Sequence, residues 1–240
     1  MGTDFAAVAG LLGHPARSTM VDALMGGDAR TAGELARAAG IAPSTASEHL
    51  GRLIDGGLVA VVARGRHRYH RLRGPEVAAA LEAFAAICPP TPVRSLRAAS
   101  HRDALREGRT CYDHLAGRLG VVLTDALGAR GWIVHHPAVD LTPAGEAALV
   151  AAGVDVAGAR AARRVFARTC LDWTERRPHL AGALGAAVAA AALDAGWVQR
   201  RDGRSVTVTG RGREVLTGLF GIPPTALAGG RADPQPAGRG

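Results

Sequence analysis

Apolar residues recur at helical spacing through the first 90 residues, and this spacing predicts a mainly helical domain. The expected helices lie at about 5–12, 16–25, 34–39, 44–55 and 75–87. β-Branched residues at 58–63 and a mixed stretch at 67–72 predict the two strands of a hairpin. The two helices within 34–55, joined by a glycine-containing turn, form the pattern of a helix-turn-helix unit.

Local signals mark where the helices of this unit begin. Thr31 and Glu34 have the spacing of a capping box, in which two side chains satisfy two free backbone amides at a helix start. Gly40 is expected to end the first helix. After a tight turn at 41–43, Ser44 is expected to cap the second helix.

The second helix of the unit has an apolar and a polar face. Ala46, Leu50 and Leu53 point inward at helical spacing. Small hydroxyl residues at a helix N-terminus can enter a major groove without clashing, so we expect the polar face to contact DNA. The candidate contacts are Ser44, Thr45, Ser47, Glu48, His49 and Arg52. Taken alone, the same face could be an ordinary solvated surface.

The hairpin that follows carries many arginines. Residues 64–67 can form its turn, and Arg71 and Arg73 extend its positive charge. A basic hairpin beside such a helix suits a phosphate backbone or a minor groove. We therefore expect contacts with DNA from Arg64, Arg66, His67 and Arg68. The basic hairpin also favours a DNA contact, rather than a solvated surface, for the preceding helix.

Composition supports a polyanionic partner. The chain has 240 residues and a formal net charge of +8 at pH 7. Its positive charge comes from arginine without any lysine, and asparagine is absent too, which fits a GC-rich bacterial genome. Because Asp and Glu could have balanced this charge, the excess indicates a basic surface for nucleic acid.

The sequence gives no sign of a membrane or secreted protein. The longest apolar run, 186–193, is much shorter than a membrane span. Asp4 and the lack of a basic start indicate that there is no signal peptide. The three cysteines are widely spaced and do not form a disulfide framework. We expect a cytoplasmic protein with reduced thiols and no membrane partner.

Residues 4–88 resemble the ArsR/SmtB family of bacterial winged-helix repressors. The resemblance rests on L-G-H-P-A-R near the start, T-A-G-E-L-A and S-T-A-S-E-H-L-G-R-L in the helix-turn-helix unit, and G-G-L-V followed by R-G-R-H-R-Y-H-R-L in the hairpin. It implies a symmetric homodimer formed by the first helix and the helix at 75–87. It also implies a double-stranded DNA operator of inverted repeats, released when an effector binds.

The chain departs from the metal-sensing members of that family. One of their sites has cysteines in the helix before the recognition helix, whereas segment 34–38 has none. Another uses Asp, His and Glu on the helix after the wing, where this chain has Glu76 and Glu82 but no histidine. The resemblance therefore implies no metal at either place. Cys88 is expected to be a buried small apolar residue rather than a sensor.

The chain beyond the first domain contains a duplication. A proline-rich break at 89–92 and a basic connecting helix at 94–106 lead to it. R-T-C-x-D at 109–113 recurs at 168–172, and H-L-A-G at 114–117 recurs at 179–182. Leu-Gly at 119–120 and 184–185, and Gly-Trp at 131–132 and 196–197, complete the match.

Each copy predicts a helix, a Gly-Trp pair, a hairpin and a helix capped by Thr142 or Thr209. The first helix is expected to bury Leu115, Leu119, Val122, Leu123 and Ala126 on one stripe, and Trp132 and Trp197 are expected to anchor the core. This order is similar to that of 44–88. The predicted fold class is therefore mainly α with small β-hairpin wings (α+β), a winged helix-turn-helix domain plus two winged-helix-like repeats.

The first predicted domain, at 1–88, binds DNA and forms the dimer. A linker with a connecting helix follows at 89–108. The C-terminal effector domain spans 109–222 and is a duplicated winged-helix-like domain, with repeats at about 109–157 and 168–222. The tail at 223–240 is rich in Pro, Gly and Ala and is expected to be disordered.

The duplication repeats residues that bind metals or react with oxidants. They are Cys111, Asp113 and His114 in the first copy and Cys170, Asp172 and His179 in the second. If a pseudo-twofold axis brings the copies together, the cysteines and histidines could form a Cys2His2 site for a transition metal such as zinc. The thiols could instead bind a soft ion or a trivalent arsenical together with Cys88, or form a redox disulfide.

Two other interpretations stay open. The same residues could line a site for a small-molecule effector. They could also be purely structural, with the aspartates as helix N-caps, the histidines bonded to backbone and the cysteines as small core residues. The separation of Cys and His differs between the copies, which argues against a shared ligand site.

The sequence predicts a DNA-binding transcriptional regulator. We expect a dimeric repressor, released from its operator by a ligand, metal or thiol-reactive signal that the C-terminal region receives. No nucleotide-binding glycine motif, H-E-x-x-H or serine nucleophile elbow occurs, so no enzyme activity is expected. The alternative is a redox or metal-binding protein or enzyme that carries an accessory winged-helix domain.

Overall fold

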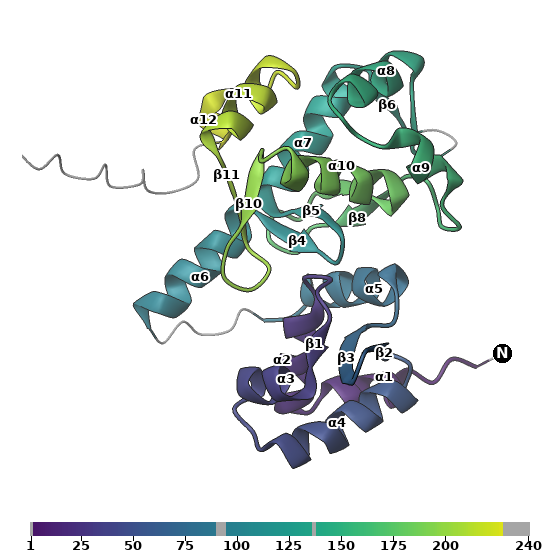
Figure 1. Cartoon of the computed structure of the whole chain (residues 1–240), viewed down its shortest axis with the longest axis vertical. Coiled ribbons are helices and arrows are strands. Elements are labelled where there is room, and N and C mark those ends of the chain that lie inside the picture. Colours follow the sequence, from purple (N-terminus) through teal and green to yellow (C-terminus); the bar gives the residue numbers. More distant parts are fainter. Residues whose placement is uncertain (1, 90–94, 136–137, 228–240) are drawn as a thin grey trace, which may run out of the picture.

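The computed structural model describes residues 2–89, 95–135 and 138–227. Two bodies are stacked along the longest axis, with the N-terminal domain below and the C-terminal repeats above (Figure 1). Helices and small antiparallel strand pairs alternate throughout, which confirms the predicted fold class. In the described residues no helix is both long and apolar enough to cross a membrane.

The N-terminal domain has the predicted helices and hairpin. Its elements are α1 (Phe5–Leu12), α2 (Pro15–Leu24), β1 (Arg30–Thr31), α3 (Ala32–Ala39), α4 (Pro43–Asp55), β2 (Val59–Arg64), β3 (His67–Leu72) and α5 (Pro75–Ala85). Met20, Leu35 and Leu53 have no exposed surface, and they pack with the other apolar faces into one core. The inward face predicted for α4, with Ala46, Leu50 and Leu53, is confirmed.

The capping box is confirmed, and the second cap is not. The Thr31 hydroxyl accepts from the Glu34 amide, and the Glu34 carboxylate accepts from the Thr31 amide. Helix α4, however, begins at Pro43, and Ala42 precedes it without a side-chain cap. Proline is well suited to the first helical position because its fixed φ matches a helix and no amide is left unpaired. Ser44 therefore lies inside the first turn, and its predicted capping role is wrong.

The sheet of this domain has a strand that the pattern did not reveal. β1 pairs with β3, and β3 pairs with β2, in the order β1-β3-β2. Two residues are too few for an alternating pattern to show.

Beyond α5, Cys88 is exposed, so the expectation that it is buried is wrong. The helix ends at Ala85, and Cys88 lies past the turn that follows it.

The connecting helix leads directly into the duplication. α6 (Leu96–Glu107) begins after Ser95, whose hydroxyl accepts from the Ala98 amide. The first repeat contains β4 (Arg109–Cys111), β5 (His114–Ala116), α7 (Gly117–Ala129), β6 (Ile133–Val134), β7 (Asp140–Leu141) and α8 (Pro143–Ala151). After α9 (Val156–Ala161), the second repeat contains β8 (Arg168–Leu171), β9 (Pro178–Ala181), α10 (Gly182–Asp194), β10 (Val198–Arg200), β11 (Val206–Val208) and α11 (Gly210–Gly218).

Both copies thus have the order hairpin, helix, hairpin, helix, and the structure differs from the predicted order in one respect. A hairpin precedes each long helix, and Leu115 lies on strand β5 rather than on the helical stripe. Each long helix starts at a glycine, because the backbone at this position has a positive φ that residues with a side chain rarely adopt. Gly117 has φ +73° and Gly182 has φ +83°. Thr142 and Thr209 cap α8 and α11 as predicted.

The long helices pack across the duplication, each against the hairpin of the other copy. Gly120 on α7 lies against the second hairpin, where an added Cβ would be in contact with the Cβ of His179 at 3.5 Å. Gly185 on α10 approaches the first hairpin in the same way, 3.3 Å from the Cβ of His114. The Thr124 hydroxyl on α7 also accepts from the amide of Leu180 on β9, at 2.8 Å. The copies therefore form one interlocked unit.

The tryptophans anchor the shared core, as predicted. Trp132 and Trp197 are both buried, and each ring meets Phe220 edge to face at 5.8 Å between centroids.

The predicted tail begins too early, because α12 (Pro224–Leu227) is helical and Leu227 is buried. Leu227 gives this segment an apolar anchor that the composition did not indicate. Residues 228–240 lie outside the described part of the chain.

Candidate functional site

Of the six DNA contacts predicted on α4, all but one are exposed. Ser44, Thr45, Ser47, Glu48 and Arg52 are exposed, and Arg52 pairs with Glu48 at 2.6 Å. His49 is buried at 7% exposure, so the expectation that it lies on the DNA-facing side is wrong. Its ring lies 4.4 Å from that of His14, whose own Nδ1 accepts from the Ala16 amide at the start of α2.

Burial changes the acid–base behaviour of His49. Desolvation lowers the pKa of His49, and the positive potential of His14 lowers it further. The ring is therefore held neutral as a packing element between α2 and α4. His49 is therefore a poor candidate for a base contact. Its position three residues after Ala46 and four before Leu53 fits the inward edge of the helix.

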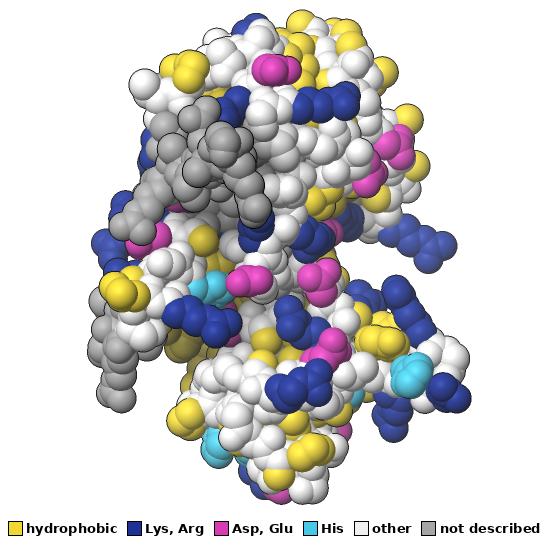
Figure 2. All heavy atoms as spheres, turned by 60° about the vertical axis from the view of Figure 1, so that its left-hand side comes forward, with side chains coloured by type: hydrophobic (Ala, Val, Ile, Leu, Met, Phe, Trp, Pro, Cys, Tyr) yellow, Lys and Arg dark blue, Asp and Glu magenta, His cyan; other side chains and the backbone are white. Residues whose placement is uncertain are grey.

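The wing is exposed and positively charged. Arg64 pairs with His67 across a two-residue turn at Gly65 and Arg66, and Gly65 has φ +58°. The side chains of all four predicted wing contacts are exposed: Arg64, Arg66, His67 and Arg68. Figure 2 shows Arg and His side chains projecting from one edge of the lower half of the molecule. The wing and the start of α4 are thus both free to approach a duplex.

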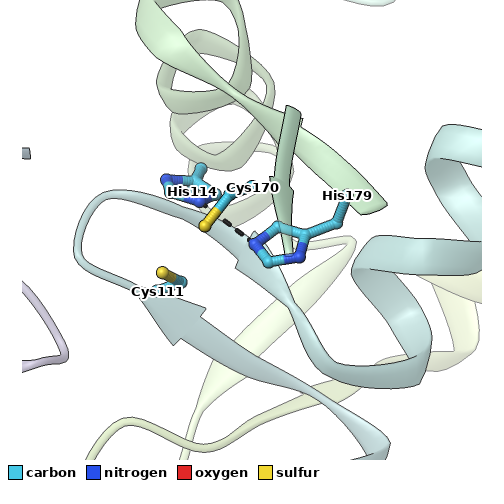
Figure 3. A group of neighbouring side chains, drawn as sticks. All are labelled: Cys111, His114, Cys170 and His179. Atoms are coloured by element: carbon cyan, nitrogen blue, oxygen red, sulfur yellow. Dashed lines mark hydrogen bonds between the residues drawn. The ribbon is translucent and has the colours of Figure 1, made fainter. Parts of the chain in front are cut away.

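At the side of the upper body that faces α5, the duplication brings four ligand-type side chains together. Cys111, His114, Cys170 and His179 each offer an atom within 4.8 Å of the others, and all four residues are buried (Figure 3). Cys111 lies directly opposite His114 in the first hairpin, and Cys170 lies opposite His179 in the second. The different spacing in sequence is absorbed by the longer turn of the second hairpin, so it does not separate the residues.

The two histidines face each other through the same ring atom. Nε2 of His114 lies 3.2 Å from Nε2 of His179, and the rings are stacked at 5.1 Å. Their other nitrogens point to the repeated aspartates, with 3.3 Å from His114 Nδ1 to Asp113 and 3.6 Å from His179 Nδ1 to Asp172. Each repeat therefore supplies a Cys, a His and an Asp behind that His.

The thiols form an unequal pair. A hydrogen bond between the two thiols raises the pKa of Cys111 and lowers that of Cys170, and both histidines also favour the Cys170 thiolate. Burial acts to lower the pKa of His114, but hydrogen bonds to Asp113 and Cys170 outweigh it and raise the pKa overall. The cluster thus favours a thiolate at Cys170, and a thiolate is the form of cysteine that binds a metal cation.

The aspartates are not caps of the helices that follow them. Asp113 lies in the turn of its hairpin and pairs with Arg164 at 2.6 Å. Asp172 accepts from the amide of Gly117 at 2.6 Å, so it caps α7 of the opposite repeat. Burial acts to raise the pKa of Asp172, but Arg109 and hydrogen bonds from Thr174 and neighbouring amides lower it to about 2.

Sequence reasoning missed the residues that connect this cluster with the DNA-binding domain. Arg109 has no exposed side-chain surface, and its Nη2 lies 3.0 Å from Asp172 and 2.9 Å from Glu82 on α5. Arg204, from the turn between β10 and β11, reaches the other oxygen of Glu82 at 2.8 Å. The available signals were the second of two acids in an alanine-rich helix and the R in the repeated R-T-C.

The two bodies also meet through backbone. The Tyr112 amide donates to the Met25 carbonyl at 2.6 Å, and the Thr110 hydroxyl donates to the Gly26 carbonyl at 3.2 Å. Arg168, the counterpart of Arg109 in the second copy, donates to the carbonyl of Pro75 at the start of α5. α5 accordingly lies at the junction, beneath β4 and β8 (Figure 1).

Comparison with known proteins identifies the domain in the N-terminal body. Residues 12–62 match a helix-turn-helix domain family, HTH_20, which confirms the predicted unit. The chain is 39% identical over 218 residues to an uncharacterized HTH-type transcriptional regulator, YdfF, of Bacillus subtilis strain 168, covering 89% of this chain and 95% of that protein. The likeness to YdfF thus extends through both bodies.

Solved structures resemble the N-terminal third. The homodimeric winged helix-turn-helix domain of Mb0332 from Mycobacterium bovis, a possible ArsR-family regulator, is 32% identical, covering 33% of this chain and 76% of that one at a TM-score of 0.30. The repressor BigR from Xylella fastidiosa is 28% identical, covering 35% and 87% at 0.31. The cadmium sensor CMTR from Mycobacterium tuberculosis is 27% identical, covering 39% and 100% at 0.31.

Proposed function

The chain belongs to the HTH-type transcriptional regulators, and from that premise we propose that it is a dimeric repressor that responds to a signal in its C-terminal repeats. In this proposal the first domain binds an operator in the bacterial cytoplasm. The repeats receive the signal and change the position of α5. We assign the protein no catalytic role.

The DNA contacts follow from exposure and charge. The start of α4 presents Ser44, Thr45 and Ser47 without a bulky side chain between them, which suits entry into a major groove. The wing arginines lie beside it and suit phosphate oxygens, since guanidinium groups form forked hydrogen bonds with them. Glu48 and Arg52 form a pair on the same face and can separate to meet a base edge.

An exposed apolar surface supports the dimer. Phe5 and Val8 on α1 are 78% and 42% exposed, and Phe84 on α5 and Ile87 beyond it are 48% and 78% exposed. Large apolar side chains exposed on two helices favour an interface there over a solvated surface. A twofold dimer on these helices would place two copies of α4 on an inverted-repeat operator.

The observation that carries the signalling part is the contact of Glu82 with two arginines of the repeats. Helix α5 belongs to the DNA-binding domain and also bears part of the proposed dimer surface. Arg109 and Arg204 hold it through Glu82, which is fully buried. A change in the repeats that moves Arg109 therefore moves α5, and with it the separation of the two recognition helices.

Operator binding in a salt series tests this proposal. Native mass spectrometry first establishes the oligomeric state, and fluorescence anisotropy then measures duplex affinity from low to physiological salt. We expect a dimer whose affinity falls steeply with salt, because arginine–phosphate contacts release counterions. A monomer with salt-independent or absent DNA binding, together with measurable turnover of a thiol or metal substrate, would support the alternative of a redox or metal enzyme.

A further inference from the structure

We propose that Cys111, His114, Cys170 and His179 form a tetrahedral site for a divalent metal ion of the zinc class. The site lies between the two repeats, and each repeat contributes one thiolate and one imidazole. It borders the DNA-binding domain, because Ala79 on α5 packs against the buried cluster that contains Cys111 and Cys170. The part of the proposal that concerns regulation rests on the function proposed above, and the site itself does not.

The donor set and its geometry fit such an ion. Two sulfur and two nitrogen donors in a tetrahedral arrangement are typical of Zn²⁺ sites. Two histidine nitrogens on one tetrahedral zinc lie about 3.3 Å apart, and the two Nε2 atoms here lie 3.2 Å apart. The four donors lie within 4.8 Å of one another, and bound thiolates lie about 3.8 Å apart, so the thiols need to close by about 1 Å at most.

The orientation of the histidines gives a second argument. Each Nδ1 faces an aspartate, which favours a proton on Nδ1 and leaves the lone pair on Nε2. Two such lone pairs, 3.2 Å apart and buried, repel each other unless a proton or a cation lies between them. A metal ion there satisfies both nitrogens at once. It also gives Nδ1 of His179, which has no hydrogen bond within the described residues, a strengthened interaction with Asp172.

The residues behind the ligands complete the site. A metal-binding histidine usually donates its other N–H to a carboxylate, which fixes the ring and raises its basicity. Asp113 and Asp172 occupy that position in the two repeats, and each is held by an arginine, Arg164 and Arg109 respectively. The repeated Cys, His and Asp therefore have distinct roles: two kinds of ligand and one group that orients a ligand.

The burial of the cluster favours an ion over an organic effector. Cys111, His114, Cys170 and His179 are all buried. A hollow of about 460 Å³ beside α9 and α10 is lined by none of these four residues. An occupant of the cluster therefore has to be small.

Occupancy of the site can reach the DNA-binding domain through buried charges. His179 Nδ1 lies 3.6 Å from Asp172, Asp172 lies 3.0 Å from Arg109, and Arg109 lies 2.9 Å from Glu82 on α5. A metal on Nε2 fixes the Nδ1–H form of His179 and draws the ring toward Asp172. Asp172 then shifts toward His179 and loosens its hold on Arg109, so Arg109 moves and α5 moves with it through Glu82.

Cobalt titration of the full-length protein tests the site. The reduced, metal-stripped protein is titrated with Co²⁺, followed by Zn²⁺ competition. We expect one Co²⁺ per chain, with sulfur-to-cobalt charge transfer in the near ultraviolet and the intense visible bands of tetrahedral cobalt, both removed by Zn²⁺. The Cys88→Ser variant, which changes the exposed cysteine, should give the same spectrum, and Cys111→Ser/Cys170→Ser should lose the charge transfer.

A variant that keeps all four ligands guards against loss of fold. Asp113→Asn should weaken Co²⁺ affinity about 10- to 100-fold without shifting the bands, because it removes only the group that orients His114. No charge transfer with fully reduced wild-type thiols, weak octahedral bands, or bands that persist in the double cysteine variant would each overturn the site. A native Cys111–Cys170 disulfide that leaves no Co²⁺ binding after reduction would overturn it too.

DNA binding separates this inference from the proposed function. The same preparation is assayed for duplex affinity with and without Zn²⁺. We expect Zn²⁺ to weaken affinity about tenfold or more, within the usual range of coupling between sites. An unchanged affinity beside a tetrahedral cobalt spectrum would overturn the relay and leave the site standing. Absent DNA binding beside the same spectrum would overturn the proposed function alone.

Discussion

The carboxylate of Glu82 and the guanidinium of Arg109 form an ion pair at 2.9 Å in which neither side chain has exposed surface. Glu82 belongs to the DNA-binding domain and Arg109 to the first repeat. Buried charges are costly unless paired, so the two bodies hold each other in one arrangement through this contact.

Replacing Glu82 by Gln should therefore destabilise the protein and uncouple its two bodies. It leaves Arg109 and Arg204 without their shared carboxylate, and removing one partner of a buried pair costs about 3–5 kcal/mol. Urea unfolding measures this loss. Glu76→Gln on the same helix is the matched control, because Glu76 is exposed, and its effect should stay within about 0.5 kcal/mol. Equal losses in both variants would contradict the assigned role of Glu82.

The wing should set the salt dependence of duplex binding. Arg66→Ala/Arg68→Ala should reduce the slope of log affinity against log salt by about 0.9 for each phosphate contact removed. The double variant Arg211→Ala/Arg213→Ala removes equal charge from exposed positions on α11 and should leave the slope close to that of the wild type. Anisotropy titrations at several salt concentrations give the slopes, and a slope that the wing substitutions do not change would rule out the wing contacts.

Thiol substitution should separate sensing from DNA binding. Cys111→Ser/Cys170→Ser keeps the size of both side chains close to the original but removes both sulfur ligands. We expect it to bind the operator with wild-type affinity in the absence of metal and to resist release by Zn²⁺. Release that remains intact would show that the two thiols are structural.

The close packing of α7 against the hairpin that precedes it makes a prediction about stability. In Gly120→Ala the new Cβ would lie 2.4 Å from the Leu115 carbonyl oxygen, which forces the helix away and should cost about 1–3 kcal/mol. Gly128→Ala on the same helix meets open space and should instead stabilise by about 0.5–1 kcal/mol. Thermal unfolding of the two variants, with opposite signs expected, checks the packing of α7 against β5 of its own copy.

Acid should weaken the contact between α2 and α4. The pKa of His49 is lowered from its ordinary value of 6.5, mainly by burial, so below pH 6.5 the unfolded chain binds a proton that the folded chain does not. Stability is thus fully present above pH 6.5 and falls as pH drops through the window just below it. The charged and titratable groups that act on His49 are His14, Arg17, Glu48 and Arg52.

Unfolding midpoints at pH 7.5 and 5.5 measure this effect. The drop between them should be smaller in His49→Gln, which cannot take up the proton, than in the wild type. His101→Gln, which changes an exposed histidine on α6, is the matched control. An equal drop in wild type and His49→Gln would exclude His49 as its cause.

The sequence was a good guide where local signals agree with tertiary packing. The capping box at Thr31, the basic wing and the duplication all carry periodic or motif information, and all three appear in the structure. Ser44 and His49 were misplaced because Pro43 extends α4 by one residue and because His14, from another helix, covers His49. Neither cause is visible in the local pattern of α4.

The cluster was identified in part and its connections were missed. The repeated Cys and His indicated a shared site, but strand register, which places Cys170 opposite His179 despite the longer turn, is a property of the folded hairpin. Glu82 and Arg109 meet across residues that are distant in sequence. From the sequence alone, each residue is expected to be a charged surface residue. The buried ion pair becomes apparent only when the structure shows the two residues in contact.

The interlocked repeats also determine how the cysteine–histidine cluster responds to the amount of protein in the cell. A site divided between the subunits of a homodimer disassembles on dilution, because its halves separate. Here both halves belong to one chain, and α7 and α10 each cover the other copy's hairpin, so the effective concentration of one half near the other is constant. Loading of the cluster should therefore depend on the free ion alone, whether the cell holds a few copies of the regulator or many.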